Sequence, residues 1–338
     1  MRGNNIMKVI NNKSITEAGT MEKSINVLSL FNGMSFCSMA LESLGVNVNK
    51  MYSSEIDKYA NQATQALFPD TIQLGDVTQW REWDIDWAGI DLVTGGFPCQ
   101  AWSMAGKQLG DKDERGMLFW TMLDIMKHVK YHNPKADFLI ENVKMKKEFE
   151  QYITTHTENA LGKVYKVLIN SALVSAQNRN RYYWTNFEVE QPEDKGVSLK
   201  DILEDLPDCP VGISVRDKSK CVRSGGRNSP IGYKHEWGSP FQRLTKKGSL
   251  KKGIEKAACL TGGANSGGNH SDMDIIHSPL ATRRYSVREC FRLQTVPEHH
   301  IDTLLNAGIS NTQLYKMCGN GWTMEVIKHI FKAMINES

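Results

Sequence analysis

A single cysteine, Cys99, stands in the segment GGFPCQAW at residues 95–102, where two glycines, an aromatic residue and a proline precede it. A buried structural cysteine behaves as a small apolar side chain and needs no such backbone arrangement. A nucleophilic thiol does need it, because its sulfur must be held in place and exposed to the molecule with which it reacts. The segment therefore indicates that Cys99 is a nucleophile.

Glu141 and two arginines are the charged residues best suited to assist this thiol. A free thiol has a pKa of roughly 8.5, and a neighbouring carboxylate would not lower it. Glu141, which ends the apolar run DFLIE, therefore suits a proton donor or acceptor toward the substrate rather than a base for Cys99. Arg179 and Arg181 alternate in QNRNRYYW, so we expect them to face one side of a strand and to supply a positive field.

Other polar residues indicate a nucleoside site. Ligands of open parallel sheets bind at the carboxyl ends of the strands, and Phe31 and Gly33 follow the first predicted strand. Glu55 follows the second strand, 22 residues after Gly33, a spacing typical of an acidic residue that binds ribose hydroxyls. Asp76 is placed to accept a hydrogen bond from an adenine amino group. Because the first loop is not G-x-G-x-x-G, an adenosine ligand without a pyrophosphate fits best.

The elements that must position these residues alternate between short apolar runs and helical periods. Strands are predicted at 25–31, 49–55, 90–96, 137–143, 164–170 and 181–187, and helices at 35–44, 57–67, 117–129 and 145–161. Strands separated by helices of this length predict a doubly wound α/β fold with a mostly parallel sheet for residues 25–188. Helical spacing returns in SVRECFRLQ at 286–294, and a last helix is predicted at 322–335.

Composition narrows the class of protein. The chain has 338 residues, of which 40% are hydrophobic and 23% charged, as in globular proteins with a sizeable core. Its seven cysteines are odd in number and form no C-x-x-C pair, which argues against a disulfide framework and a zinc ribbon. No apolar run predicts a membrane span or a signal peptide. We therefore expect a reducing compartment and no membrane partner.

The charges are distributed unevenly along the chain. Between residues 213 and 256 there are 12 Lys/Arg and 3 Asp/Glu, which gives this block +9 in a chain of net charge +3. Such a block is either a solvated surface or the electrostatic footprint of a polyanion. We predict a flexible extension at 1–24 and a small inserted domain at 189–277. The first domain, 25–188, would then be completed by 278–338.

Six segments together resemble the DNA cytosine-5 methyltransferases over residues 25–338. They occur in the order that the family shows, and they are LSLFNG, GGFPCQAWS, ENV, QNRNRYYW, SVRECFRLQTVP and GNGWTMEVI. The first, the arginine-containing and the last segments resemble the de novo branch of animals most, whereas the short inserted domain is more similar to bacterial and phage members. The resemblance implies the Rossmann-like fold of class I S-adenosylmethionine-dependent methyltransferases.

It also implies a reaction on C5 of a cytosine in double-stranded DNA. Cys99 would attack C6, Glu141 would bind and protonate N3, and Arg181 would hold O2 with Arg179 in support. Covalent addition turns C5 into an enamine carbon that accepts the methyl group of S-adenosylmethionine. Loss of the C5 proton and elimination of Cys99 would release the product. The target base must be flipped out of the duplex, because neither face of C6 is reachable in the stack.

The remaining assignments also follow from the resemblance. The cofactor pocket would be lined by Phe31, Gly33, Glu55, Ile56, Asp76, Val77, Pro98, Leu118, Asn320, Gly321 and Trp322. Asn32 and Ser35 depart from the acidic or small residues of many members, and Gly321 stands where bacterial members often have serine. The basic domain would recognise the target sequence through phosphate and base-edge contacts.

Some residues outside this pattern carry simpler expectations. Cys37 and Cys318 are predicted to be core residues. His299 and His300 are predicted to lie in a surface loop rather than in a metal site, and no metal is expected. A monomer is expected.

Two alternatives stay open from the sequence. One is a tRNA cytosine-5 methyltransferase on the same fold, although ECFRLQ matches the Cys-Phe-Thr signature of that branch poorly. The other is a catalytically silent DNA-binding partner. A methyltransferase could serve restriction–modification, phage protection or epigenetic regulation. The protein would be cytoplasmic in a bacterial or phage-infected cell and nuclear in a eukaryote.

Overall fold

The computed structural model describes residues 24–98, 116–204 and 285–337, and the backbone of four short strands between residues 241 and 283. Its main feature is a seven-stranded sheet in the order β3-β2-β1-β4-β5-β7-β6. The strands are β1 (Ile25–Leu30), β2 (Val48–Ser54), β3 (Ile72–Gln73), β4 (Leu92–Gly95), β5 (Asp137–Val143), β6 (Tyr165–Asn170) and β7 (Asn180–Thr185).

The strand order creates a switch point in the middle of the sheet. β1 pairs in parallel with β2 on one side and with β4 on the other, and β2–β3 and β4–β5 are also parallel. Only β7 runs against its neighbours, β5 and β6. The chain therefore moves outward from β1 to β3 and then returns to the other side of β1, which opens a crevice at the carboxyl ends of the strands. The predicted doubly wound, mostly parallel sheet is confirmed.

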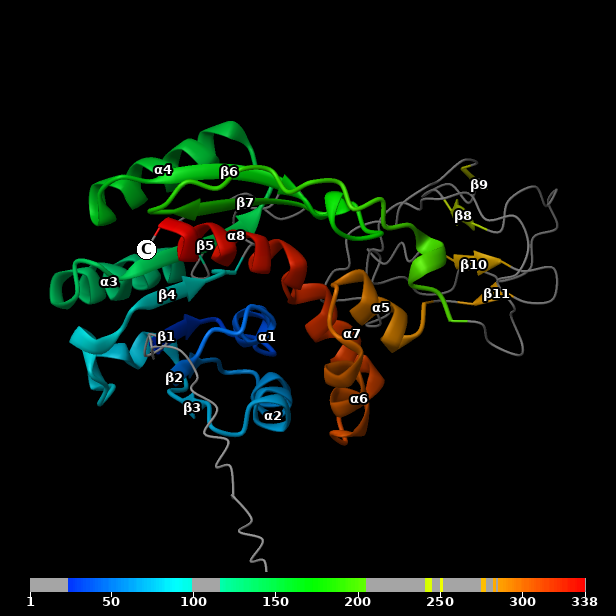
Figure 1. Ribbon diagram of the computed structural model, residues 1–338, viewed down its shortest axis with the longest axis horizontal. Coiled ribbons are helices and arrows are strands. Elements are labelled where there is room, and N and C mark those ends of the chain that lie inside the picture. Colours follow the sequence, from blue (N-terminus) through cyan, green and yellow to red (C-terminus); the bar gives the residue numbers. More distant parts are fainter. Residues whose placement is uncertain are drawn as a thin grey trace, which may run out of the picture.

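Helices cover both faces of this sheet, as Figure 1 shows. One face carries α1 (Phe36–Ser43), α2 (Lys58–Leu67), α5 (Val287–Leu293), α6 (Glu298–Asn306), α7 (Asn311–Asn320) and α8 (Met324–Glu337). The other carries α3 (Met117–His132) and α4 (Lys147–Leu161), with the 3₁₀ turn η1 (Val77–Glu82) beside them. The side chains of β1 show why two cores form. Val27 points into the first core and Leu28 and Leu30 into the second, as the period of two in a strand requires.

The C-terminal helices differ most from the sequence expectation. The strand predicted at 137–143 is β5, and the helix predicted at 322–335 is α8. The expected loop around His299 and His300 is wrong, because both residues lie in the first turn of α6 and His300 is only 5% exposed. Ile301 and Leu304 form the rest of its buried stripe. Histidine counts as polar in a hydrophobic pattern. The buried stripe that His300 shares with Ile301 and Leu304 is therefore not visible in the sequence.

The main core continues beyond the boundary predicted at residue 188. Val189, Leu199 and Ile202 belong to the same buried cluster as α5 and α8. The described part of this core ends at residue 204 and begins again at 285. Four strands within the intervening segment form a separate small sheet, in the order β11-β10-β8-β9. They are β8 (Phe241–Leu244), β9 (Leu250–Lys251), β10 (Ile275–His277) and β11 (Thr282–Arg283), and Figure 1 shows them beyond α5 and α7.

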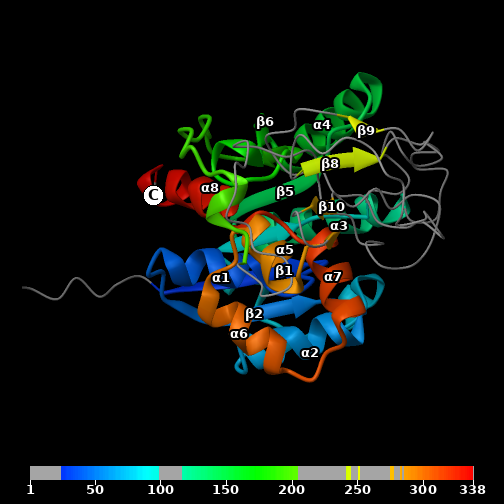
Figure 2. The same ribbon diagram turned by 90° about the vertical axis from the view of Figure 1, so that its right-hand side faces the viewer.

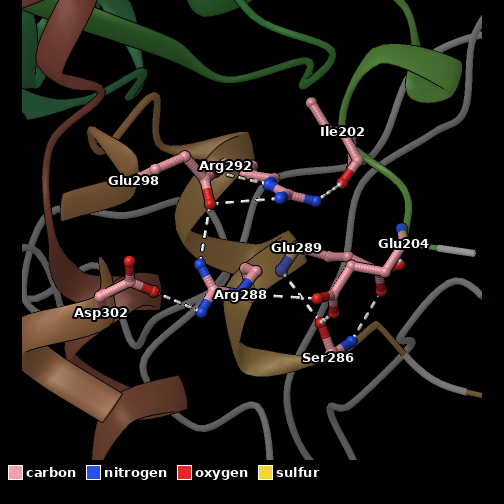
Figure 3. Close-up of polar contacts among 8 residues, drawn as sticks. All are labelled: Ile202, Glu204, Ser286, Arg288, Glu289, Arg292, Glu298 and Asp302. Atoms are coloured by element: carbon pink, nitrogen blue, oxygen red, sulfur yellow. Dashed lines mark hydrogen bonds and ion pairs between the residues drawn. The ribbon is translucent and has the colours of Figure 1, made fainter. Parts of the chain in front are cut away.

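A buried carboxylate joins the outgoing and returning chain, as Figure 3 shows. Glu289 is fully buried and accepts a hydrogen bond from the backbone N–H of Glu204 at 2.8 Å and from that of Ser286 at 2.7 Å. The Ser286 hydroxyl in turn donates to the carboxylate of Glu204. Both ends of the inserted segment are thereby fixed to α5.

Two arginines of α5 extend this junction toward α6. Arg288 pairs with Glu298 at 2.8 Å and with Asp302 at 2.6 Å, and Arg292 pairs with Glu298 at 2.6 Å. Arg292 also donates to the carbonyl of Ile202 at 3.2 Å. The exit point of the inserted segment is therefore tied through α5 to α6.

None of the helices in the described residues combines the length and the apolar character that a membrane span needs.

Candidate active site

The carboxylate of Glu141 is the centre of the candidate site. Glu141 lies in β5, opposite Tyr183 of β7, and is only 8% exposed. Its Oε1 atom pairs with Nε of Arg181 at 2.9 Å, and its Oε2 atom accepts a hydrogen bond from the indole N–H of Trp322 at 3.2 Å. Both carboxylate oxygens therefore have a donor, and the side chain is held in one orientation near the carboxyl end of β5.

The segment that leads to Cys99 passes directly beside this carboxylate. Gly95 ends β4 opposite Ile140. A Cβ atom on the next residue, Gly96, would lie 3.1 Å from Oε2 of Glu141 and 3.0 Å from Nε1 of Trp322. These distances are tighter than ordinary contacts, so a side chain at Gly96 would press on the Glu141–Trp322 hydrogen bond. The second glycine of GGFPC, Gly96, thus has a steric reason.

Asn142 anchors the same segment one step further on. Its side-chain amide is buried and donates to the carbonyl of Phe97 at 3.1 Å. Pro98 is the last described residue before the cysteine. Cys99 itself, like the rest of 99–115, lies outside the described residues. The structure fixes the segment that precedes Cys99, because the carbonyl of Phe97 is hydrogen-bonded to Asn142, the residue after Glu141.

The cysteines that the structure describes are all core residues. Cys37, Cys290 and Cys318 are buried and free of disulfides. Burial raises the pKa of the Cys37 thiol to about 12, and it raises that of Cys290 well above its ordinary value. None of these three is suited to act as a thiolate nucleophile. The core placement predicted for Cys37 and Cys318 is confirmed.

The two arginines of QNRNRYYW have different partners. Arg181 lies in β7 and contacts Glu141, whereas Arg179 immediately precedes the strand and is 2% exposed. The guanidinium of Arg179 donates to the carbonyl of Gly321 at 2.6 Å and, more weakly, to that of Gly319 at 3.4 Å. Arg179 therefore holds the backbone of the GNGW segment, and Trp322 of that segment reaches Glu141.

On the other side of the switch point, the loop after β1 has an unusual backbone. Phe31 and Ser35 have φ angles of 53° and 67°, in the left-handed region that non-glycine residues rarely adopt. Asn32 donates to the Ser35 hydroxyl at 2.8 Å, and this hydroxyl lies 2.9 Å from that of Thr64. The two departures from the family pattern, Asn32 and Ser35, thus form a buried network that supports the loop.

Glu55 connects this loop to the end of β2. Its carboxylate accepts hydrogen bonds from the backbone N–H groups of Gly33, Ile56 and Asp57 at 2.9, 2.8 and 2.9 Å. The side of Ile56 away from the chain is open, since this residue is 75% exposed. Asp76 follows β3 and uses Oδ1 to accept from the N–H of Thr78 at 2.8 Å. No described residue bonds to its Oδ2.

These features fit an adenosine moiety. An exposed apolar side chain such as Ile56 suits the face of a base, and Oδ2 of Asp76 suits an amino group. Val77 is buried under the same turn, and Leu118 lies half-buried in the first turn of α3. Phe31, Gly33, Glu55, Ile56, Asp76 and Val77 all follow the carboxyl ends of β1, β2 and β3, which are neighbours in the sheet. Asn320, Gly321 and Trp322 lie at the junction of α7 and α8.

The absence of a side chain at Gly321 is required by Phe36. A Cβ atom at Gly321 would lie 2.0 Å from Cε2 of Phe36 and 3.0 Å from the carbonyl oxygen of Met317. Its φ of −72° is open to any residue, so the constraint is purely steric. The serine that bacterial members often carry here cannot be accommodated without displacing the Phe36 ring.

We expect Gly321→Ala to lower the free energy of unfolding by about 1–3 kcal/mol, because overpacking displaces the Phe36 ring. Denaturant unfolding of the full chain measures this. Phe36→Leu should make the same glycine substitution cost less, since contacting residues are coupled. If the two substitutions were simply additive, the contact between residues 321 and 36 would not be the cause.

Sequence reasoning missed the contacts between segments. Asn142 was assigned no role, although it belongs to the quoted ENV segment. Trp322 was assigned only to the cofactor, whereas its indole N–H donates to Glu141. No spacing rule joins residues 181 positions apart, so only the common location at a sheet edge could have indicated this contact.

The comparisons with known proteins agree with this geometry. The family model for C-5 cytosine-specific DNA methylases matches residues 25–336. The type II methyltransferase M.NlaX of Neisseria lactamica is 31% identical over 321 residues, covering 91% of this chain and 95% of the relative. M.HhaI of Haemophilus parahaemolyticus is 30% identical over 328 residues, covering 90% and 93%.

Solved structures share the fold at lower identity. The methyltransferase EhMeth of Entamoeba histolytica superposes with a TM-score of 0.63 at 14% identity, covering 93% of this chain and 99% of that one. The Dnmt2 methyltransferase of S. pombe gives 0.58 at 16% identity, with coverage of 93% and 99%. At these identities, the likenesses show the fold alone.

Proposed function

The chain belongs to the C-5 cytosine-specific DNA methylase family, and on that premise we propose which of its residues carry out the reaction and where its DNA binds. The protein is a DNA (cytosine-5) methyltransferase that uses S-adenosylmethionine. One observation supports the site assignment best. The carboxylate of Glu141 is bonded to both Arg181 and Trp322, and it lies beside the segment that precedes Cys99.

The steps follow from the chemistry of cytosine. The Cys99 thiolate attacks C6, and Glu141, which reacts as the carboxylic acid, gives its proton to N3 and becomes a carboxylate, so that negative charge does not build up on the ring. Arg181 holds O2 while its Nε keeps Glu141 in place. The new S–C6 bond makes C5 an enamine carbon and hence a nucleophile. After C5 has gained the methyl group, water takes the C5 proton, and the C5–H electron pair re-forms the C5–C6 double bond as Cys99 leaves C6 as a thiolate. N3 returns its proton to the Glu141 carboxylate.

S-adenosylmethionine, when bound, supplies the methyl group as an electrophile. The chain would hold its adenosine at Ile56 and Asp76, with Glu55 at the ribose. The loop at 31–33 and the segment 320–322 would lie on either side of the ligand. Pro98, Val77 and Leu118 complete the proposed lining. Because Phe36 fills the space beside Gly321, the two halves of this lining are packed against each other.

Arg179 acts in this proposal through the backbone rather than on the base. Its guanidinium holds the carbonyl of Gly321, and the next residue, Trp322, donates to Glu141. Trp322 thus connects the cofactor segment 320–322, to which it belongs, with the catalytic carboxylate. Arg179 and Trp322 are positioning residues, whereas Cys99, Glu141 and Arg181 contact the cytosine.

Replacing Trp322 tests this role. We expect Trp322→Phe to lower kcat about fivefold, because it removes one hydrogen bond to a carboxylate, worth about 1 kcal/mol, and keeps the aromatic ring. The KM for S-adenosylmethionine should change little, whereas Trp322→Ala should raise it. Steady-state methyl transfer measures both constants. Trp87→Phe, at a half-buried indole in the turn η2 (Trp87–Gly89), is the matched control. An unchanged kcat in Trp322→Phe would show that the indole N–H does not position Glu141.

Target recognition is assigned to the inserted segment. We place the DNA-reading domain between residues 205 and 284, between the last described residue of the main core and the start of the segment that leads into α5. The +9 block at 213–256 supports this, since phosphate contacts need such charge. The junction of Glu289 with Glu204 and Ser286 supports it further, because it fixes both ends of the inserted segment.

The cellular role follows the relatives. M.NlaX and M.HhaI are type II methyltransferases, so we propose that this enzyme protects DNA in a bacterial restriction–modification system, in the cytoplasm. The resemblance of three segments to the de novo branch of animals stays a prediction. Methyl transfer to duplex DNA, with tRNA in a parallel reaction, tests the substrate.

A further inference from the structure

Three side chains that bind metals well meet away from the methyl-transfer site. Glu42 lies in the last turn of α1, and His299 and His300 lie in the first turn of α6. Nε2 of His300 is 2.6 Å from Oε2 of Glu42, and Nε2 of His299 is 4.0 Å from the same oxygen. One ligand atom from each residue lies within 4.8 Å of the other two.

The two histidines differ in a way that suits a metal site. The His300 side chain is only 6% exposed, and its ring lies 5.4 Å from that of Phe68, so its position is fixed by packing. The His299 side chain is 69% exposed and free to adjust. One ligand is therefore rigid and one is adaptable.

The charge of the cluster also favours a cation. Within the parts of the chain that the structure describes, no Lys or Arg pairs with Glu42, whose recorded partners are the two histidines. Glu42 also lies at the C-terminal end of α1, where the helix dipole is negative, and this last turn has no basic residue. Among the described residues, a cation at this cluster would therefore displace no Lys or Arg from Glu42.

We propose that Glu42, His299 and His300 bind one divalent transition-metal ion of the Zn²⁺ class. Two imidazole nitrogens and one carboxylate oxygen are a ligand set that such ions accept, with water in the fourth position. Ligand atoms about 2.0–2.2 Å from zinc lie about 3.4 Å apart in a tetrahedron. Glu42 must then withdraw slightly from His300 and His299 must move closer. Both moving side chains are more than half exposed, at 52% and 69%.

The site would join two distant parts of the chain. α1 follows the cofactor loop, whereas α6 belongs to the segment that returns after the inserted domain, and Figure 2 shows α6 beside α1 and α2. Glu42 and His300 are separated by 258 positions. A metal bound only by the folded chain stabilises the fold. The sequence predicted no metal, because it placed the histidines in a loop and gave no reason to join them to Glu42.

Zinc titration of the full-length enzyme tests this. The enzyme is freed of metal with a chelator, kept reduced, and titrated with zinc sulfate while heat release and thermal unfolding are followed. We expect one zinc ion per chain and an unfolding midpoint that rises with zinc concentration. His299→Ala should weaken zinc binding at least tenfold and abolish the rise. This variant removes an exposed side chain and leaves the His300–Glu42 hydrogen bond in place, so it should fold as the wild type does.

Two controls separate the site from other zinc ligands. His329→Ala, at a half-buried histidine of α8 outside the cluster, should keep the full rise. Cys99→Ser should also keep it, because the proposed site does not include that thiol. The proposal is overturned if zinc leaves the wild-type midpoint unchanged, or if the rise persists in His299→Ala. The second result would direct attention to the His128–His132 pair on α3, whose ring centroids lie 4.6 Å apart. Loss of the rise in Cys99→Ser would also overturn it.

Discussion

Replacing Cys99 by alanine should reduce methyl transfer by about 10⁴-fold or more while leaving DNA binding intact. The expected loss is large because C5 of cytosine is a poor nucleophile until a covalent bond forms at C6, and no other group in the proposed site can form that bond. Cys37, Cys290 and Cys318 are buried and cannot replace it. Transfer of labelled methyl groups to duplex DNA measures the rate, and a gel-shift titration measures binding.

The adduct itself gives a second readout for Cys99. DNA with 5-fluorocytosine at the target should trap the wild-type enzyme covalently, because fluorine at C5 cannot leave as the proton does. Cys99→Ala should give no such adduct, whereas Cys37→Ala, the matched control in the core, should still form it. A trapped adduct in Cys99→Ala, or a residual rate close to that of the wild type, would show that another residue is the nucleophile.

Replacing Glu141 by glutamine should reduce kcat about 10²–10⁴-fold, the usual contribution of a general acid or base. Glutamine has nearly the same shape, and its carbonyl oxygen can still accept from Trp322. It cannot deliver a proton to N3 of the cytosine, so addition of Cys99 to C6 becomes slow. The affinity for DNA should change little, since the duplex contacts are assigned to the inserted domain.

Glu148→Gln is the matched control, because Glu148 is an acidic residue in the first turn of α4, a short distance along the chain from β5, and pairs only with Lys146 at 3.6 Å among the described residues. Its kcat should equal that of the wild type. If Glu141→Gln were as active as this control, proton transfer by Glu141 would play no part in the reaction. If it lost DNA binding rather than turnover, Glu141 would be a binding residue.

The local elements could be predicted from the sequence because their periodicity is strong. The run DFLIENV predicts β5 to the residue, and the apolar stretch after residue 116 predicts α3, which extends to His132. These segments are buried on both faces of the sheet or along a broad stripe, so their hydrophobic pattern is decisive. The sequence predicted a doubly wound, mostly parallel sheet, but it did not predict the order of the strands, since pairing depends on contacts between residues far apart.

The contacts within the site could not be predicted, because they depend on side chains that meet only after folding. The hydrogen bond from Trp322 to Glu141 and the contact between Gly321 and Phe36 each join the C-terminal segment to the first half of the chain. α6 was missed because buried His300 looks polar in the sequence. Cys99 was identified from its local glycines and proline, and it stays a prediction, since it lies outside the described residues.

The most direct measurement is methyl transfer from labelled S-adenosylmethionine to mixed-sequence duplex DNA, with tRNA in a parallel reaction and bisulfite sequencing of the DNA product. We predict label on DNA alone and methylated cytosines confined to one sequence context. Label on tRNA alone would contradict the assignment of DNA as the substrate. DNA binding without transfer to either nucleic acid would contradict the catalytic role of Cys99 and Glu141.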